Sequence, residues 1–140
     1  MKTRDPKLGL LQSVPGLSGV REQELASVAA LVDELRVEPG TVLAREGATC
    51  HEVALILEGR ASLSVGGRPE GHVGPGELLG ALPLLEQVPH TSTALAETPM
   101  RMLLAGPESY GALLSHPAIQ TCVTSHLVSQ IRRFDESASS

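Results

Sequence analysis

Residues 76–94, GELLGALPLLEQVPHTSTA, combine two glycines, a short apolar segment and a return that follows a proline. Gly76 and Gly80 permit backbone conformations and close approaches that a side chain would prevent. The apolar segment that starts at Ala81 is long enough for one or two helical turns. Residues 92–96 have the composition of a strand. The stretch therefore predicts a glycine turn, a short helix and a return strand.

The start of this short helix is a candidate anion site. Its first N–H groups have no intrahelical acceptor, and the summed peptide dipoles place about half a positive charge there. Such a helix N-terminus can hold a phosphate or another anion. The structural alternative is that the glycines and the helix only cover one corner of a barrel. These residues alone leave both interpretations open.

Short strand-like segments, separated by turn residues, flank this stretch on both sides. Pro39-Gly40 and Gly66-Gly67 are examples of the turn signals. About eight short strands at such spacing predict a jelly-roll or another barrel. The predicted fold class is therefore mainly β with flanking helices. The strand candidates are residues 35–37, 41–44, 53–57, 61–65, 71–73, 78–80, 92–96 and 100–104.

Helical patterns occupy the two ends of the chain. Residues 7–13 predict a short helix, and residues 21–34 predict a helix that packs through one apolar stripe. Toward the other end, a helix starts near Pro107, is interrupted at His116-Pro117 and is followed by a final helix over residues 118–134. The stripe of the second helix consists of Leu25, Val28, Ala29, Val32 and Leu35.

The final helix carries its own apolar stripe, which needs a cover. The cover is either the barrel of the same chain or a second copy of the helix. We expect a homodimer formed through this helix, and folding back onto the barrel is the alternative. Residues 135–140, DESASS, are expected to be disordered. The stripe consists of Ile119, Val123, Leu127, Ile131 and Phe134.

The stretch over residues 76–94 resembles the phosphate-binding cassette of the cyclic nucleotide-binding domain family, as found in catabolite activator protein-like sensor domains. The family pattern runs Gly-acid-x-Phe/Leu-Gly-Glu-x-x-Leu-Leu and then Pro-Arg-Ser/Thr-Ala-x-Val. In that family the Glu holds the ribose hydroxyl and the Arg pairs with the cyclic phosphate. The resemblance also implies that amides of the short helix complete the phosphate cradle.

This sequence departs from the family pattern at the two strongest ligand contacts. Gly80 matches, but Ala81 stands at the position of the Glu and His90 stands at the position of the Arg. Thr91 matches the small hydroxyl residue that follows the Arg. The resemblance therefore implies a degenerate cassette that keeps the shape and loses side-chain contacts. The ligand-binding residues that it implies are Gly80, Ala81, Leu82, His90 and Thr91.

The resemblance extends over most of the chain, from about residue 10 to residue 134. Residues 37–65, VEPGTVLAREGATCHEVALILEGRASLSV, are similar to the family's AGxxLFxEGDxxDxLYxILSGxVxL, and residues 14–29 match its N-terminal helical lead-in. It implies a double-stranded β-helix (jelly-roll) barrel with N-terminal helices and a C-terminal helical pair. We expect residues 1–140 to form this single domain, ordered over about 10–134, with no DNA-binding domain.

Composition argues against several other classes of function. The net charge of −5 opposes nucleic-acid binding, which depends on cations that neutralise phosphates. No apolar run is long enough to span a membrane and no signal peptide is evident, so a cytoplasmic location without membrane association is expected. Cys50 and Cys122 are interpreted as buried or idle thiols. The histidines, His51, His72, His90, His116 and His126, lack the spacing of metal-binding cupins, so no metal site is predicted.

No catalytic residue is predicted, because neither a Gly-x-Ser-x-Gly elbow nor a phosphate loop with its Lys-Ser/Thr occurs. The sequence therefore predicts a non-enzymatic regulatory or sensor module. In its first form, the cassette binds a cyclic nucleotide (cAMP or cGMP) weakly, or another phosphate-like anion. In the alternative, the same fold binds no ligand and works as a dimerising protein or docks a protein partner.

Overall fold

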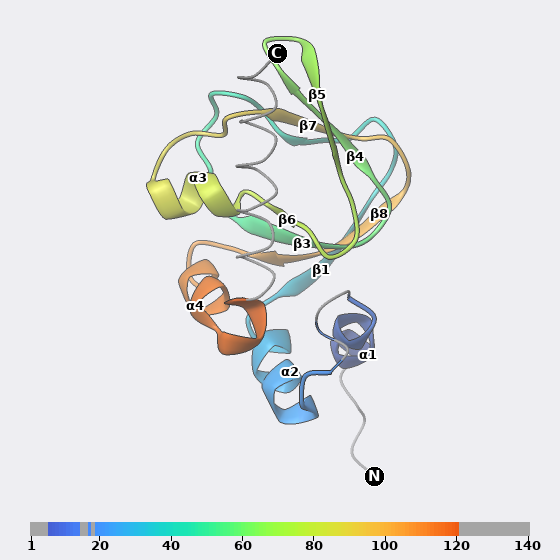
Figure 1. Cartoon of the computed structure of the whole chain (residues 1–140), viewed down its shortest axis with the longest axis vertical. Coiled ribbons are helices and arrows are strands. Elements are labelled where there is room, and N and C mark those ends of the chain that lie inside the picture. The colour runs from blue at the N-terminus through green and yellow to red at the C-terminus, as the bar shows by residue number, and fades with distance from the viewer. Residues whose placement is uncertain (1–5, 15–16, 18, 121–140) are drawn as a thin grey trace.

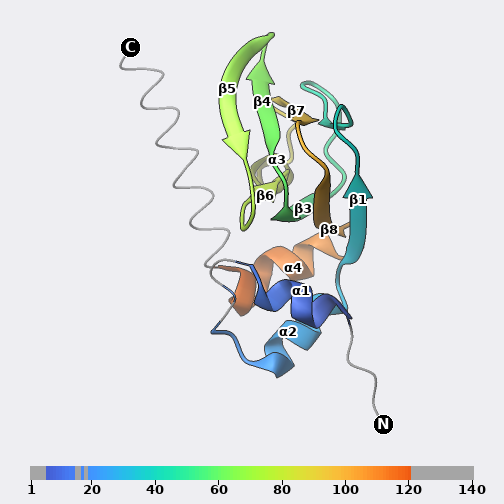
Figure 2. The same ribbon diagram turned by 90° about the vertical axis from the view of Figure 1, so that its right-hand side faces the viewer.

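A computed structural model describes residues 6–14, 17 and 19–120 of the chain. In this part, eight strands form a barrel, and helices from the two ends of the chain gather at one end of it, while the short helix in the middle of the chain lies at its side (Figures 1 and 2). The helices are α1 (Pro6–Gln12), α2 (Glu22–Ala29), α3 (Ala81–Glu86) and α4 (Tyr110–Ser115). The strands are β1 (Asp33–Val37), β2 (Val42–Ala44), β3 (Val53–Glu58), β4 (Ala61–Val65), β5 (Arg68–Val73), β6 (Leu78–Leu79), β7 (Thr93–Ala96) and β8 (Met100–Ala105).

The strands belong to two four-stranded sheets with the orders β1-β8-β3-β6 and β2-β7-β4-β5. Their pairings are antiparallel, and strands far apart in sequence lie side by side, as β1 and β8 do. Two such sheets with crossing connections are typical of a jelly-roll. The predicted mainly β fold with flanking helices is confirmed, and each of the strand candidates corresponds to an observed strand.

The interior between the two sheets is lined by small and flexible apolar side chains. On β4, Ala61 and Leu63 are buried while Ser62 and Ser64 are partly exposed, which is the alternation expected for a strand with one buried face. Half of the buried members are alanines, and none is aromatic. The buried members are Ala44, Ala54, Ile56, Ala61, Leu63, Val73, Ala94, Ala96, Met100 and Met102.

A second apolar cluster joins the helices to the outer face of the β1-β8-β3-β6 sheet. Strand β3 contributes Val53, Leu55 and Leu57 to this cluster and Ala54 and Ile56 to the barrel interior. Because β3 is covered on both faces, its sequence reads as a continuous apolar run rather than an alternating one. The helical side of the cluster includes Leu11, Leu25, Val28, Leu113 and Ile119.

The sequence-based boundaries of the second helix were wrong. Helix α2 ends at Ala29, whereas the apolar periodicity predicted a helix up to residue 34. Leu35 does not extend the helical stripe, because it lies in β1, where it pairs with Met102 and is 37% exposed. Strand β1 pairs along its whole length with β8, so sheet pairing replaces the last helical turn.

The interruption at His116-Pro117 is confirmed. Helix α4 ends at Ser115, and the chain is helical again over residues 117–120, where the Ala118 N–H donates to His116 Nδ1 at 3.1 Å. Ile119, the first residue of the predicted dimer stripe, is fully buried within the helical cluster of its own chain. The rest of that stripe lies outside the described residues, as do Cys122, His126 and the C-terminal end of the predicted ordered region, whereas its start near residue 10 lies within α1.

Gly59, in the turn between β3 and β4, generates a stability prediction. Its φ of +91° is unfavourable for other residues, and an added Cβ would overlap the Pro99 carbonyl oxygen and lie 2.7 Å from Met100 Cγ. We expect Gly59→Ala to lower the free energy of unfolding by about 2–4 kcal/mol in urea denaturation. Gly67→Ala is the control, since its φ is +81° but nothing lies within 4 Å of its added Cβ. Equal losses in both variants would contradict the packing argument.

Candidate functional site

Gly80 fixes the start of the cassette against a neighbouring loop. It precedes α3 with a φ of +91°, and an added Cβ would lie 2.6 Å from the Glu52 carbonyl oxygen and 3.3 Å from Cys50 Sγ. The buried Cys50 thiol lies 3.5 Å from the carbonyl oxygens of both Glu52 and Gly80, and burial raises the pKa of this thiol. Only glycine fits this position, and the interpretation of Cys50 as a buried thiol is confirmed.

Helix α3 is six residues long and is followed by a left-handed residue. The Leu84 N–H donates to the Gly80 carbonyl at 3.2 Å, and the Val88 N–H donates to the Pro83 carbonyl at 2.9 Å. Gln87 follows the helix with a φ of +56°, a conformation that is costly for a residue with a side chain. The predicted sequence of glycine turn, short helix and return strand is therefore present.

Two backbone hydrogen bonds tie the return segment of the cassette to the loop between β2 and β3. The His90 N–H donates to the Ala48 carbonyl at 2.9 Å, and the Gly47 N–H donates to the His90 carbonyl at 2.8 Å. Where the return segment enters β7, the Glu46 N–H donates to Thr93 Oγ1 at 3.1 Å. The backbone at position 90 is thus held in place independently of its side chain.

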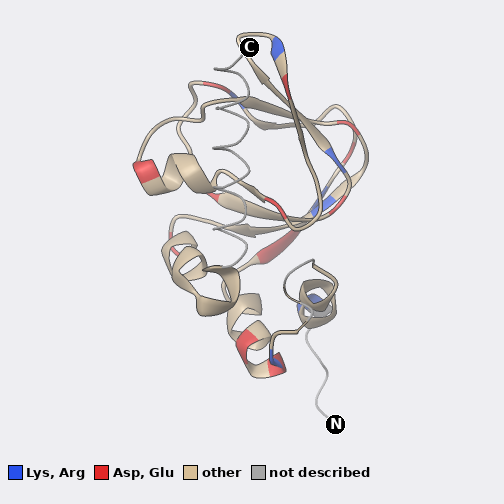
Figure 3. Ribbon diagram, in the orientation of Figure 1, with Lys and Arg blue, Asp and Glu red and all other residues tan. Residues whose placement is uncertain are grey.

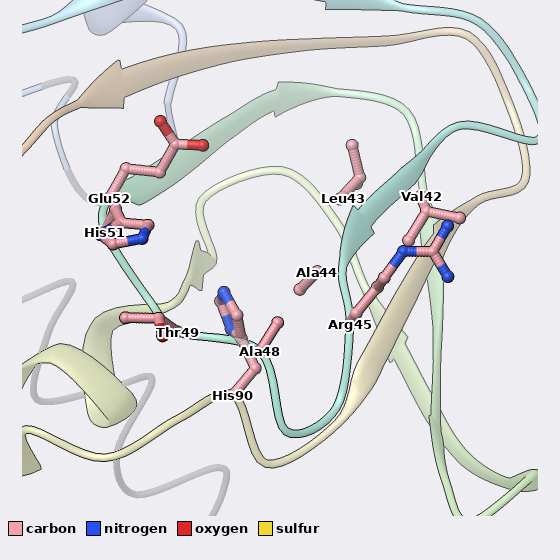
Figure 4. Close-up of a pocket in the computed structure, with 9 residues that line it drawn as sticks. All are labelled: Val42, Leu43, Ala44, Arg45, Ala48, Thr49, His51, Glu52 and His90. Atoms are coloured by element: carbon pink, nitrogen blue, oxygen red, sulfur yellow. The ribbon is translucent and has the colours of Figure 1, made fainter.

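The His90 imidazole lines a pocket of about 220 Å³ between β2 and the loop that follows it. In Figure 4 the His90 ring lies between Arg45 on one side and His51 with Glu52 on the other. Apolar side chains of β2 form one wall. The complete lining is Val42, Leu43, Ala44, Arg45, Ala48, Thr49, His51, Glu52 and His90.

Burial favours the neutral form of His90 in the free protein. Loss of solvent lowers the pKa of His90; the Glu52 carboxylate opposes this shift, and the nearby His51 adds to it. A neutral imidazole donates one hydrogen bond and accepts another, but it has no permanent charge. Within the described part of the chain, no group of three or more His, Cys, Asp or Glu side chains is placed to hold a metal ion.

The structure separates the predicted ligand residues into two groups. Gly80, Ala81 and Leu82 form the start of α3, where Ala81 is fully buried in the helical cluster and Leu82 is partly buried. His90 lies in the pocket, and Thr91 beside it is exposed. Of the five residues, only His90 lines the pocket.

Sequence reasoning missed three charged or titratable residues of the pocket, Arg45, His51 and Glu52. One signal was present in the sequence comparison, because the family pattern has Asp at the position of His51. For Arg45 and Glu52 no pattern was available, since contacts between segments far apart in the sequence bring these residues next to the cassette.

Similarity to known proteins agrees with this geometry. The family model for the cyclic nucleotide-binding domain matches residues 34–116. A cAMP-dependent protein kinase regulatory subunit from Colletotrichum orbiculare is 26% identical over 74% of this chain and 27% of its own length. The structure of the regulatory subunit of a cAMP-independent protein kinase A from Trypanosoma brucei has a TM-score of 0.77 at 21% identity, covering 94% of this chain and 47% of that one.

The structure of a cAMP-binding acyltransferase from Mycobacterium smegmatis is 25% identical, with a TM-score of 0.70 over 84% of this chain and 38% of that one. The chain spans about a third or less of the length of the curated relatives that it matches. In the described residues, no helix has both the length and the apolar character needed to cross a membrane. Because the family model matches more than half of the sequence and the fold agrees, this chain belongs to the cyclic nucleotide-binding domain family.

Proposed function

We propose that this domain is a non-enzymatic sensor or regulatory module whose cassette binds a cyclic nucleotide weakly or binds a different phosphate-like anion. One observation carries the proposal. The cassette keeps the glycine turn, the short helix and the clamped return segment, while Ala81 and His90 occupy the positions of the family's Glu and Arg. The retained backbone supports anion binding by amides, and the changed side chains reduce its strength.

The similarity to the M. smegmatis protein, which is described as a cAMP-binding acyltransferase, supports a ligand of the cyclic nucleotide type. That protein is described both as cAMP-binding and as an acyltransferase. A domain of this family can therefore occur in a protein that also has an enzymatic activity. We infer that the domain described here regulates an effector and contributes no catalytic residue itself. A cytoplasmic location fits such a role.

A second candidate is a dimerising or partner-docking protein that binds no ligand. It is favoured by the cassette surface, where Leu85 is 52% exposed and Val88 is 36% exposed. The full burial of Ala81 also fits a cassette that packs as a structural element. Protein purified under native conditions and then denatured separates the candidates, because the sensor should release a bound small anion and the docking protein should not.

The first prediction of this proposal concerns the affinity for cAMP. A hydrogen bond to a charged group contributes about 1.5–3 kcal/mol, so the missing Glu and Arg together should weaken binding by about 3–6 kcal/mol, or roughly two to four decades. We expect calorimetry to show cAMP binding weaker than micromolar. His90→Arg should strengthen it, because a guanidinium is permanently charged.

His72→Arg is the matched control for that variant, since His72 is exposed on β5 and does not line the pocket. Ala81→Glu is a poorer test, because the new carboxylate would replace a fully buried methyl group. Sub-micromolar binding of cAMP by the unaltered chain would contradict the prediction that the cassette has a reduced affinity for cAMP.

The second prediction concerns pH. The pKa of His90 is lowered in the free protein, and a bound anion would raise it by stabilising the charged imidazole. The bound state then holds more protons than the free state, so affinity should increase as the pH falls from about 7.5 to 5.5. His90→Gln should flatten this dependence of phosphate binding in calorimetry.

The other charged or titratable groups that line this pocket are Arg45, His51 and Glu52. His51→Gln is therefore the control, and it should leave most of the pH dependence in place. An unchanged pH dependence in His90→Gln would remove His90 as a ligand contact.

The third prediction concerns assembly and rests on the sequence of the final helix. A stripe that includes Val123, Leu127 and Ile131 is apolar enough to need a cover, so we expect a homodimer through it. Leu127→Glu should convert the dimer into a monomer in sedimentation velocity runs. If the unaltered protein already sediments as a monomer, the helix instead covers its own chain.

A further inference from the structure

The carboxylate of Glu46 joins the tip of the β4–β5 hairpin to the loop that holds the return segment of the cassette, residues 45–52. We propose that Glu46 is a positioning residue: by fixing this loop to the hairpin, it keeps the His90 backbone in place. Glu46 lies outside the cassette and does not line the pocket. The inference concerns the backbone of the site, and it rests on the proposed function only where ligand affinity is measured.

The tip of the hairpin leaves one backbone donor without an acceptor on its own strands. Gly66 and Gly67 both have a positive φ, +58° and +81°, and Val65 pairs with Arg68 on either side of them. A two-residue turn of this kind is closed by hydrogen bonds between the flanking pair, so the Gly66 N–H needs another acceptor. Glu46 Oε1 accepts from it at 2.8 Å. A hydrogen bond to a carboxylate is stronger than one between neutral groups.

On the loop side, the contacts of Glu46 continue directly into those of the cassette. The next residue, Gly47, donates its N–H to the His90 carbonyl at 2.8 Å, and the His90 N–H donates to the Ala48 carbonyl at 2.9 Å. The Ala48 N–H closes the turn by donating to the Arg45 carbonyl at 3.0 Å. A displacement of Glu46 would therefore move both backbone groups that hold His90.

The sheet alone gives this loop an irregular attachment. The register of the β2–β7 pairing shifts between Val42 and Ala44, just before the loop begins. Beyond it, the Glu46 N–H donates to Thr93 Oγ1 at 3.1 Å, a bond that uses the backbone of Glu46 and remains when its side chain is changed. The hairpin tip and the loop lie toward the end of the barrel opposite α2 (Figures 1 and 2). The Glu46 carboxylate thus adds the contact on the hairpin side of the loop.

The test is a measurement of backbone order in the full, ligand-free chain by ¹⁵N relaxation. We expect Glu46→Ala to lower the order parameters of Gly47 and His90 from about 0.85, typical of a rigid backbone, to below about 0.6. Glu46→Gln should keep the rigid values, because the side-chain carbonyl of glutamine still accepts from the Gly66 N–H. The order parameter reports motion within the native state, so a change in overall stability does not alter it.

Glu70→Ala is the matched control, because it also removes an exposed glutamate from this end of the barrel. Figure 3 shows the acidic position of β5 close to the hairpin tip. Within the described part of the chain, the Glu70 side chain makes no hydrogen bond or ion pair. The control should therefore leave the order parameters of Gly47 and His90 unchanged. Loss of order in Glu46→Ala that Glu46→Gln and Glu70→Ala do not share supports the positioning role.

Unchanged order in Glu46→Ala, or an equal loss in either of the other variants, overturns the positioning role. Calorimetric titration of the same variants with inorganic phosphate and with cAMP separates this inference from the proposed function. Where the unaltered chain binds, Glu46→Ala should weaken binding by about 3- to 10-fold, since the ligand must order the loop again. Binding that Glu46→Ala leaves unaltered also overturns the role. If neither compound binds, the proposed function fails, and the relaxation measurement alone decides the role of Glu46.

Discussion

The contact between Gly80 and the backbone of Glu52 is the constraint on which the cassette depends. A side chain at position 80 would overlap the Glu52 carbonyl oxygen, and the left-handed backbone there turns β6 directly into α3. Because the same loop also carries Cys50 and the residues that bind the His90 backbone, one glycine contact and two hydrogen bonds hold both ends of the cassette against one loop. The cassette shape therefore survives changes in its ligand-contacting side chains.

The cassette thus keeps the backbone of the family but not its two strongest ligand-contacting side chains. The family's Glu and Arg are replaced by a buried alanine and a partly buried histidine, neither of which adds a permanent charge. The adjacent pocket is lined by Arg45, directly after β2, and by Glu52, directly before β3. In the function that we propose, such a site binds a small anion or holds a nucleotide only weakly, and protonation of His90 strengthens the binding.

The sequence was sufficient to locate the strands and the short helix of the cassette because the turns between them depend on local chemistry, although β1 and β5 begin earlier than predicted, at Asp33 and Arg68. Glycine and proline turns separate the strands, and the Gly80 turn is visible as a single required residue. The end of α2 could not be predicted in this way. The apolar periodicity continues through Val32 to Leu35, but Leu35 lies in β1 and pairs with Met102 of β8. The pocket was also beyond local patterns, because residues 42–52 meet His90 through contacts between segments far apart in the sequence, namely the β2–β7 pairing and the backbone hydrogen bonds of Gly47 and Ala48.

The most direct test of the account is a map of backbone amide and histidine ring resonances during titration with phosphate and with cAMP. If the retained cassette shape binds anions, saturable shifts should appear together at the amides of Ala81 and Leu82 and at the His90 ring, with smaller shifts elsewhere. Resonances of His72, which lies outside the pocket, report non-specific effects. Saturable shifts confined to other surfaces, or no saturable shifts with either compound, would contradict the claim that the cassette is an anion site.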